Sequence, residues 1–249
     1  MENASLLISA GLAFFAAGTV KGIAGLGMPT AAIALITLFE GPRVAIALVL
    51  FPMLAANMWQ LWRGGLIHRT AQRYWLFALV LFCGVMATAF GTAGAGDQIL
   101  LGALGVVVLI FVAASVRRMI PPLPERLDRA AQVGFGLFAG VIGGMTAAWG
   151  PPLAMYLATR EVDKDEFIRA TGFLIVVGSI PLCLSYAQLG FLSGPLAGVS
   201  VAMILPTILG FTVGERLRGH LSPEGFRNAI LIVFAILGLN LIRRAIWYT

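Results

Sequence analysis

The sequence predicts an all-α membrane protein that crosses the bilayer several times and is built from two inverted repeats. Hydrophobic residues make up 59% of the chain, charged residues make up only 11%, and the mean hydropathy is +0.94. Soluble domains carry about 25% charged residues, so this composition is typical of a polytopic membrane protein. A pattern of glycines and a proline near residue 20 returns 122 residues later and divides the chain into two similar halves.

The repeated pattern is a pair of glycines four residues apart, followed by a proline. Its members correspond in the order Gly18, Gly22 and Pro29 to Gly140, Gly144 and Pro151. Glycine and proline interrupt transmembrane helices, and transporters built from internal repeats place their ligand at such interruptions. The alternative interpretation is that each glycine pair only allows two helices to pack closely.

In each half the pattern predicts a broken-helix hairpin followed by three transmembrane helices. Residues 4–39 form the first hairpin, because the segment 30–39 has about half of the roughly 20 residues that a crossing needs. Residues 131–159 form the second hairpin, with a short arm on each side of its break. Full spans are expected at 43–62, 74–93, 99–116, 167–188, 196–214 and 226–246. The first repeat therefore covers 1–116, a linker covers 117–130, and the second repeat covers 131–249.

The positions of the basic residues favour hairpins over single crossings. With hairpins, one side of the membrane collects most basic residues and the other keeps only Arg43, Arg243 and Arg244. With single crossings they divide almost evenly, against the tendency of Lys and Arg to remain in cytoplasmic loops. The basic loops and the linker are therefore predicted to be cytoplasmic and both termini to lie outside. Each half then crosses an odd number of times, so the second repeat is inverted relative to the first.

The first break is predicted to bind an anion. The glycines Gly22, Gly25 and Gly27 let backbone amides approach a ligand, and Pro29 suits the first turn of a half-helix, where Thr30 follows. The unpaired N–H groups and the partial positive charge at the start of such a half-helix attract anions.

Lys21 is the only charged residue that lies inside a hydrophobic stretch and away from its ends. A cation at the bilayer centre costs roughly 2.5–3.5 kcal/mol on insertion scales, so it normally faces a cavity or a partner. Every Asp and Glu lies in or beside a loop, which leaves a bound anion as the expected counter-charge for Lys21. The alternative is that the Lys21 side chain extends to the cytoplasmic interface.

The second break should point a second half-helix at the same region from the opposite face, so that the two tips meet near the midplane. Its candidate substrate-binding residues are Gly144, Thr146, Trp149, Gly150 and Pro151. Thr146 offers a hydroxyl, and Trp149 offers an indole N–H or an apolar wall. Asn57 and Ser179, on the first full span of each half, are further candidates for the cavity.

Other classes of function fit the sequence poorly. The net charge of +6 is scattered beside helix ends, as membrane topology requires, so no nucleic-acid partner is predicted. His68 and His220 fall in loops without metal-ligand spacing or a nucleophile motif, so we predict no enzyme, metal site or cofactor. A channel would need more polar residues along its spans. The expected partners are a small anionic substrate and the lipid bilayer.

Two motifs carry a resemblance to a known family. Gly-x-x-Lys-Gly-x-x-Gly-x-Gly opens the first half, and Gly-x-x-x-Gly followed by Gly-Pro-Pro opens the second. Together they resemble the sulfite exporter TauE/SafE family of bacterial permeases over the whole length of the chain. Many members read Gly-Gly-Gly at positions 27–29, where this chain has Gly27-Met28-Pro29, and have a small residue at the position of Trp149.

The resemblance implies a multi-pass protein of the bacterial inner membrane that transports sulfite or a related sulfur-containing or organosulfonate anion. We expect it to work by alternating access around the two hairpin tips. An anion channel, or an uptake permease for another organic anion, is the alternative.

Overall fold

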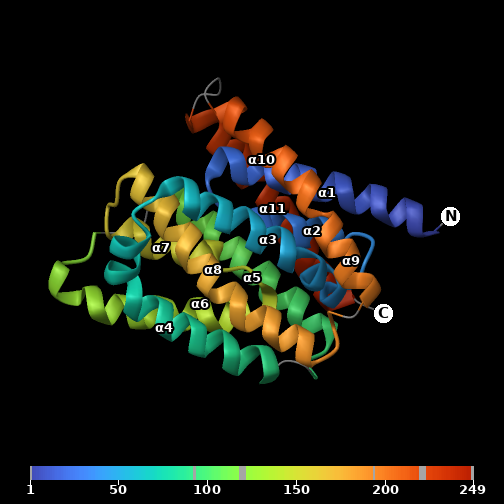
Figure 1. Cartoon of the computed structure of the whole chain (residues 1–249), viewed down its shortest axis with the longest axis horizontal. Coiled ribbons are helices and arrows are strands. Elements are labelled where there is room, and N and C mark those ends of the chain that lie inside the picture. Colours follow the sequence, from blue (N-terminus) through green and yellow to red (C-terminus); the bar gives the residue numbers. More distant parts are fainter. Residues whose placement is uncertain (1, 92–93, 118–121, 193, 219–222, 248–249) are drawn as a thin grey trace.

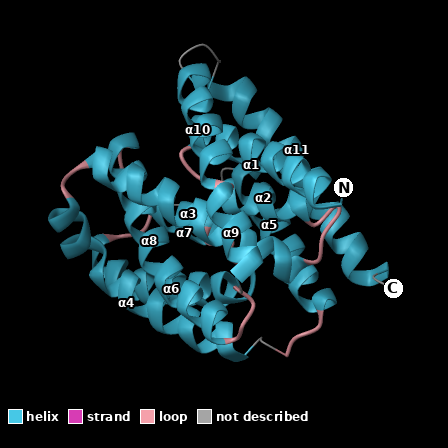
Figure 2. Ribbon diagram, turned by 45° about the vertical axis from the view of Figure 1, so that its right-hand side comes forward, coloured by secondary structure: helices cyan, strands magenta, loops and turns pink. Residues whose placement is uncertain are grey.

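The computed structural model describes residues 2–91, 94–117, 122–192, 194–218 and 223–247, and every regular element in these ranges is a helix (Figures 1 and 2). The all-α prediction is therefore confirmed. In chain order the elements are α1 (Glu2–Ala24), α2 (Met28–Ile36), α3 (Pro42–Gly64), α4 (Ile67–Gly91), α5 (Asp97–Arg117), the short 3-10 helix η1 (Glu125–Leu127), α6 (Asp128–Thr146), α7 (Gly150–Thr159), α8 (Lys164–Gln188), α9 (Gly194–Ala202), α10 (Ile204–Arg218) and α11 (Pro223–Trp247).

Several helices are long and apolar enough to cross a membrane. Within the described residues, five segments meet this condition: Leu7–Ala24, Pro42–Gly64, Ile67–Gly91, Lys164–Gln188 and Gly194–Leu217. A shorter apolar helix covers Asp97–Ala113. Large apolar side chains such as Leu12, Leu205 and Ile236 are exposed on the surface, as expected for side chains that face lipid. The chain is a multi-pass membrane protein.

The first broken stretch is an unequal hairpin. α1 has 23 residues, about 35 Å at 1.5 Å per residue, whereas α2 has only 9. Gly25 and Gly27 form the turn with φ angles of 79° and 93°, which favour glycine because other residues are strained there. Pro29 lies in the first turn of α2. The half-helix predicted to begin at this proline is confirmed.

The second broken stretch also has one long arm. α6 has 19 residues and α7 has 10. The prediction that both arms are short is wrong for α6, because this helix continues through Gly143 and Gly144 and ends at Thr146. A glycine inside a helix costs only about 1 kcal/mol, which packing against a neighbouring helix offsets. Pro151 lies in the first turn of α7, as predicted.

The span expected at 196–214 is divided into two helices. α9 ends at Ala202 and α10 begins at Ile204. Pro206 explains the interruption, because proline has no N–H and its ring clashes with the carbonyl four residues earlier, at Ala202.

Each half packs its first helix on the second full span of the other half. α1 lies on α10, and α6 lies on α4, while α3 pairs with α8 and α5 pairs with α11 (Figure 1). Two repeats at 1–116 and 131–249 would account for this exchange, and their bounds stay a prediction. Their inverted orientation stays a prediction. Within the predicted linker 117–130, residues 118–121 lie outside the described residues.

Glycines allow these exchanged helices to approach closely. A Cβ at Gly18 would collide with the backbone oxygen of Thr207 in α10. A Cβ at Gly140 would lie 2.9 Å from the Cα of Gly84 in α4, closer than real Cβ contacts. Close helix packing, the alternative interpretation of the repeated glycines, therefore explains Gly18 and Gly140.

Gly18→Ala is expected to destabilise the protein by about 1–3 kcal/mol, because the added methyl meets backbone atoms that cannot rotate away. Gly11→Ala in the same helix is the matched control, since a Cβ at Gly11 meets nothing within 4 Å. Thermal unfolding of the purified proteins in detergent measures both. Equal melting temperatures for the two variants would contradict the packing described above.

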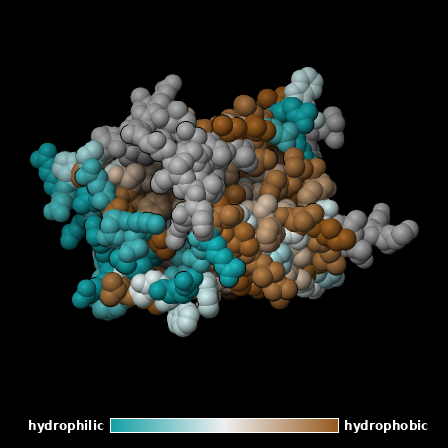
Figure 3. Space-filling model, turned by 90° about the horizontal axis from the view of Figure 1, so that it is seen from above, coloured by the Kyte–Doolittle hydropathy of each residue, from teal (hydrophilic) through white to brown (hydrophobic). Residues whose placement is uncertain are grey.

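Polar side chains gather at one end of the molecule, seen at the left of Figure 3. Two ion pairs join helix ends there: Arg73 to Glu166 at 2.7 Å, and Arg160 to Asp128 at 3.2 Å. Both chain termini lie at the opposite end, at the right of Figure 1. This arrangement agrees with basic loops that share one side of the membrane, and the cytoplasmic assignment of that side stays a prediction.

Candidate functional site

The two breaks lie against each other. A Cβ on Gly150, the first residue of α7, would be 3.5 Å from the Leu26 side chain and 3.9 Å from the Gly27 nitrogen. The starts of α2 and α7 are therefore neighbours, although they come from different halves of the chain. The sequence predicts such a meeting of the two tips.

Lys21 lies in the last turn of α1 and is almost completely buried, with 1% of its surface exposed. Its Nζ donates a hydrogen bond of 2.8 Å to Oδ1 of Asn57, and Nδ2 of Asn57 donates to the Met53 carbonyl. The Phe211 ring of α10 lies 6.0 Å from Nζ. Asn57 is seven residues before the end of α3 at Gly64, so Lys21 lies about 10 Å from that end. The side chain does not extend to the surface.

No carboxylate forms an ion pair with Lys21 in the part of the chain that the structure describes. Among the described residues, the polar group bonded to its ammonium is the neutral Asn57 amide. A buried ammonium normally needs a negative partner, because removing it from water is costly. Lys21 therefore lacks a negatively charged partner among the described residues, and a bound anion would supply one.

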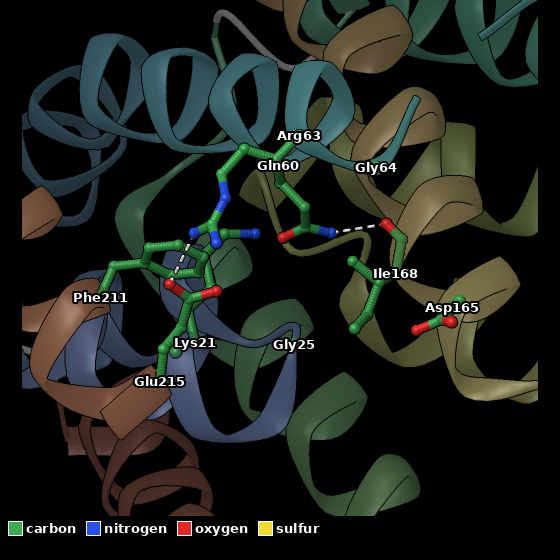
Figure 4. Close-up of a pocket in the computed structure, with 10 residues that line it drawn as sticks. Lys21, Gly25, Gln60, Arg63, Gly64, Asp165, Ile168, Phe211 and Glu215 are labelled. Carbon is green, nitrogen blue, oxygen red and sulfur yellow. Dashed lines mark hydrogen bonds and ion pairs between the residues drawn. The ribbon is translucent and has the colours of Figure 1, made fainter. Parts of the chain in front are cut away.

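A cavity of about 220 Å³ opens beside Lys21 (Figure 4). Gly22 and Gly25 of the first break line it together with Lys21. The opposite wall comes from α3, α8 and α10, and includes Gln60, Arg63, Gly64, Asp165, Ile168, Phe211 and Glu215. The cavity runs from the buried Lys21 to Arg63, whose side chain is 52% exposed.

The start of α2, three residues beyond the cavity-lining Gly25, offers hydrogen-bond donors. The first N–H groups of a helix have no partner within the helix. The Thr30 hydroxyl, in the first turn, is 2% exposed and bonds to no other described group. The start of α7 offers fewer donors, because Pro151 and Pro152 have no N–H. Of the two predicted half-helix ends, α2 is the better suited to an anion.

Trp149 fills, in the second half, the place that Lys21 takes in the first. Its indole is completely buried, and a Cβ at Gly143 would overlap the indole nitrogen. A Cβ at Gly178, near the middle of α8, would lie 3.1 Å from indole Cε2. Gly143 is the residue that corresponds to Lys21 after 122 positions. The aromatic ring therefore occupies the space that this missing side chain leaves.

Ser179, Thr146 and Gly144 lie outside the cavity lining. The Ser179 and Thr146 hydroxyls each donate to a backbone carbonyl of their own helix. Gly144 packs against Thr88 of α4. Gly22 has two roles, because it lines the cavity and packs tightly against α10. The structure thus brings together Lys21, Gly22, Gly25 and Asn57, with Gly27, Pro29, Thr30, Gly150 and Pro151 at the adjoining helix starts.

Arg63 and Glu215 line the cavity, although the sequence does not predict them as site residues. The expectation that no carboxylate pairs with Lys21 agrees with the ion pairs of the described residues. Two carboxylates nevertheless share its cavity, Asp165 and Glu215, and Glu215 pairs with Arg63 at 2.9 Å. A Cβ at Gly22 would lie 2.8 Å from the Glu215 nitrogen. The spacing of Gly210 and Gly214, equal to that of Gly18 and Gly22, is the signal that could have placed α10 on α1.

Comparison with known proteins gives one match. A family model described as Sulfite exporter TauE/SafE matches residues 10–241, which include both breaks and every residue of the cavity. No curated protein and no solved structure matches the chain.

Proposed function

The chain belongs to the sulfite exporter TauE/SafE family of membrane transporters, and on this premise we propose that it carries sulfite or a related organosulfonate past Lys21. The family implies a transporter of sulfur-containing anions. The choice of sulfite or an organosulfonate, the bacterial inner membrane with the basic loops in the cytoplasm, and both termini outside are part of this proposal.

The observation that carries the proposal is the burial of Lys21 beside a cavity, bonded to a neutral amide instead of a carboxylate. A small oxyanion in this cavity would supply the missing negative charge. It would accept hydrogen bonds from Nζ and, as the first break opens, from the N–H groups at the start of α2. The unpaired Thr30 hydroxyl adds a further donor in the same turn.

The contact between the two breaks favours a carrier over a channel, because it closes the path beyond the cavity. The cavity reaches Gly25, and beyond it Leu26 packs against the start of α7. An anion at Lys21 would therefore pass only after the two breaks separate. We propose that movement of the hairpins against each other exposes Lys21 to the two sides of the membrane in turn.

Transport by purified protein in proteoliposomes tests the proposal. Labelled sulfite, thiosulfate, sulfoacetate and sulfate are offered one at a time, and we expect saturable flux of at least one of them, with counterflow when the unlabelled anion is inside. Counterflow distinguishes a carrier from a channel. If flux is no greater than that of protein-free liposomes for any of the four anions, the proposal is contradicted.

Asn57→Asp is expected to weaken anion binding about tenfold or more. The new carboxylate has the size of the amide and would lie at the 2.8 Å position beside Nζ, so it would supply the negative charge that we assign to the substrate. A tenfold loss corresponds to about 1.4 kcal/mol, which is small for a close charge pair. Titration calorimetry with sulfite and thiosulfate measures the change.

Asn240→Asp is the control for Asn57→Asp, because Asn240 lies on α11 and bonds to Arg243 in an exposed position. It should bind anions like the wild type. If Lys21 had only a structural role, Asn57→Asp would stabilise its buried neighbour and leave binding intact. Unchanged binding in the folded Asn57→Asp protein would therefore count against the proposal.

A further inference from the structure

The cavity contains its own negatively charged groups near its open end. Arg63 of α3 and Glu215 of α10 form an ion pair of 2.9 Å across it, and Figure 4 shows the pair beside Lys21 and Phe211. The charged residues that line the cavity are Lys21, Arg63, Asp165 and Glu215, so the lining is formally neutral. An anion that reaches Lys21 must pass Arg63 while Arg63 is bound to a carboxylate.

A carboxylate presents the same chemistry to a guanidinium as a small oxyanion does. Both offer negatively charged oxygens that accept hydrogen bonds from the planar donors of arginine. The structure has one contact between Nη1 of Arg63 and Oε2 of Glu215. A guanidinium has five N–H donors, so an incoming oxyanion can contact Arg63 before the Glu215 carboxylate leaves it. Glu215 therefore occupies the position on Arg63 that a substrate oxyanion would take.

The pair is exposed enough to exchange partners. The side chains of Arg63 and Glu215 are 52% and 28% exposed. Exposed ion pairs contribute little to stability, whereas removing one partner of a fully buried pair is strongly unfavourable. After an exchange, Glu215 keeps access to water, so the substrate can replace it at low cost.

The exchange would also act on the helices. The Arg63–Glu215 pair joins α3 to α10, and α10 packs along α1, the helix that carries Lys21. Replacing Glu215 by a diffusible anion removes this ionic link between α3 and α10 while the anion arrives. The anion then enters the cavity in the same step in which the Arg63–Glu215 ion pair breaks.

We propose that the transported anion replaces the Glu215 carboxylate on Arg63, which makes Arg63 a second anion-binding residue and Glu215 a built-in competitor. This inference rests on the proposed function. In this proposal Glu215 helps to set the affinity of the site. Its carboxylate is bonded to Arg63 when the cavity is empty and leaves Arg63 when the substrate enters.

Glu215→Gln and Arg63→Gln test the exchange, with sulfite and thiosulfate binding to the purified full chain as the measurement. Glu215→Gln removes the competitor at constant size, and we expect it to tighten binding about threefold to tenfold. Arg63→Gln should weaken binding about tenfold. In the double variant Glu215→Gln should have no further effect, because the competition takes place on Arg63. Exposed Glu125→Gln and Arg69→Gln repeat the charge changes away from the cavity and should bind like the wild type.

Unchanged or weaker binding in Glu215→Gln would overturn the exchange, as would tighter binding that persists in the Arg63→Gln background. Arg63→Lys, which keeps the charge, provides a second variant if Arg63→Gln does not fold, and the same dependence is expected in weaker form. A failure of the proposed function looks different, because then the wild type itself binds none of the anions, or Lys21→Gln binds them as well as the wild type.

Discussion

Lys21→Gln is expected to reduce anion flux about 30-fold or more while the protein remains folded. Truncating one partner of a buried charge pair costs about 2–5 kcal/mol, and 2 kcal/mol corresponds to about 30-fold. Glutamine is neutral and keeps an N–H donor that points toward Asn57, so the substitution leaves no buried charge between α1 and α3 without a partner. The loss should therefore appear in transport and not in stability. Flux of labelled sulfite and thiosulfate in proteoliposomes, together with thermal unfolding, measures the two separately.

Lys164→Gln is the matched control for Lys21→Gln. Lys164 begins α8 in an exposed position and does not line the cavity, so the same loss of charge should leave flux unchanged. Wild-type flux in a folded Lys21→Gln protein would remove Lys21 from the transport path.

Trp149→Ala is expected to destabilise the protein by about 3–5 kcal/mol, the usual cost of truncating a buried tryptophan. Its indole is completely buried, and it lies against Gly143 and Gly178. Denaturant or thermal unfolding in detergent measures the change. Trp75→Ala is the control, since Trp75 is exposed on α4 and should cost far less.

A double variant shows whether Trp149 occupies the position that we describe. Gly143→Ala alone should be destabilising, because its methyl would overlap the indole nitrogen. In the Trp149→Ala background the same methyl enters empty space, so Gly143→Ala should be neutral or stabilising. Additive effects of the two substitutions would contradict the close contact.

The sequence was sufficient for the all-helical membrane fold and for the two proline-started half-helices. Local chemistry determines these features, because proline has no N–H and suits a first turn, and because Gly25 and Gly27 tolerate positive φ angles. The length of α6 could not be predicted in this way. Whether Gly143 and Gly144 interrupt a helix depends on what packs beside them, and α4 is distant in the sequence.

The candidate site could be predicted only in part, because some of its residues come together only through packing between helices that are distant in the sequence. A lysine inside an apolar stretch is visible in the sequence, and Asn57 was a candidate because it is a polar residue on the neighbouring span. Arg63 and Glu215 resemble ordinary charged residues near helix ends, and only the packing of α10 on α1 brings Glu215 into the cavity. The structure places the Trp149 indole against Gly143 and Gly178, outside the cavity lining, and its contribution to the site stays a prediction. The two halves differ because one carries a cation where the other carries an aromatic filler.

Equilibrium binding of sulfite, thiosulfate, sulfoacetate and sulfate to the purified wild type and to Lys21→Gln tests the central claim most directly. If a bound anion is the counter-charge of Lys21, at least one of the four binds the wild type, and the affinity of the folded Lys21→Gln protein for that anion is lower by about 30-fold or more. An anion that binds both proteins with equal affinity would contradict the account.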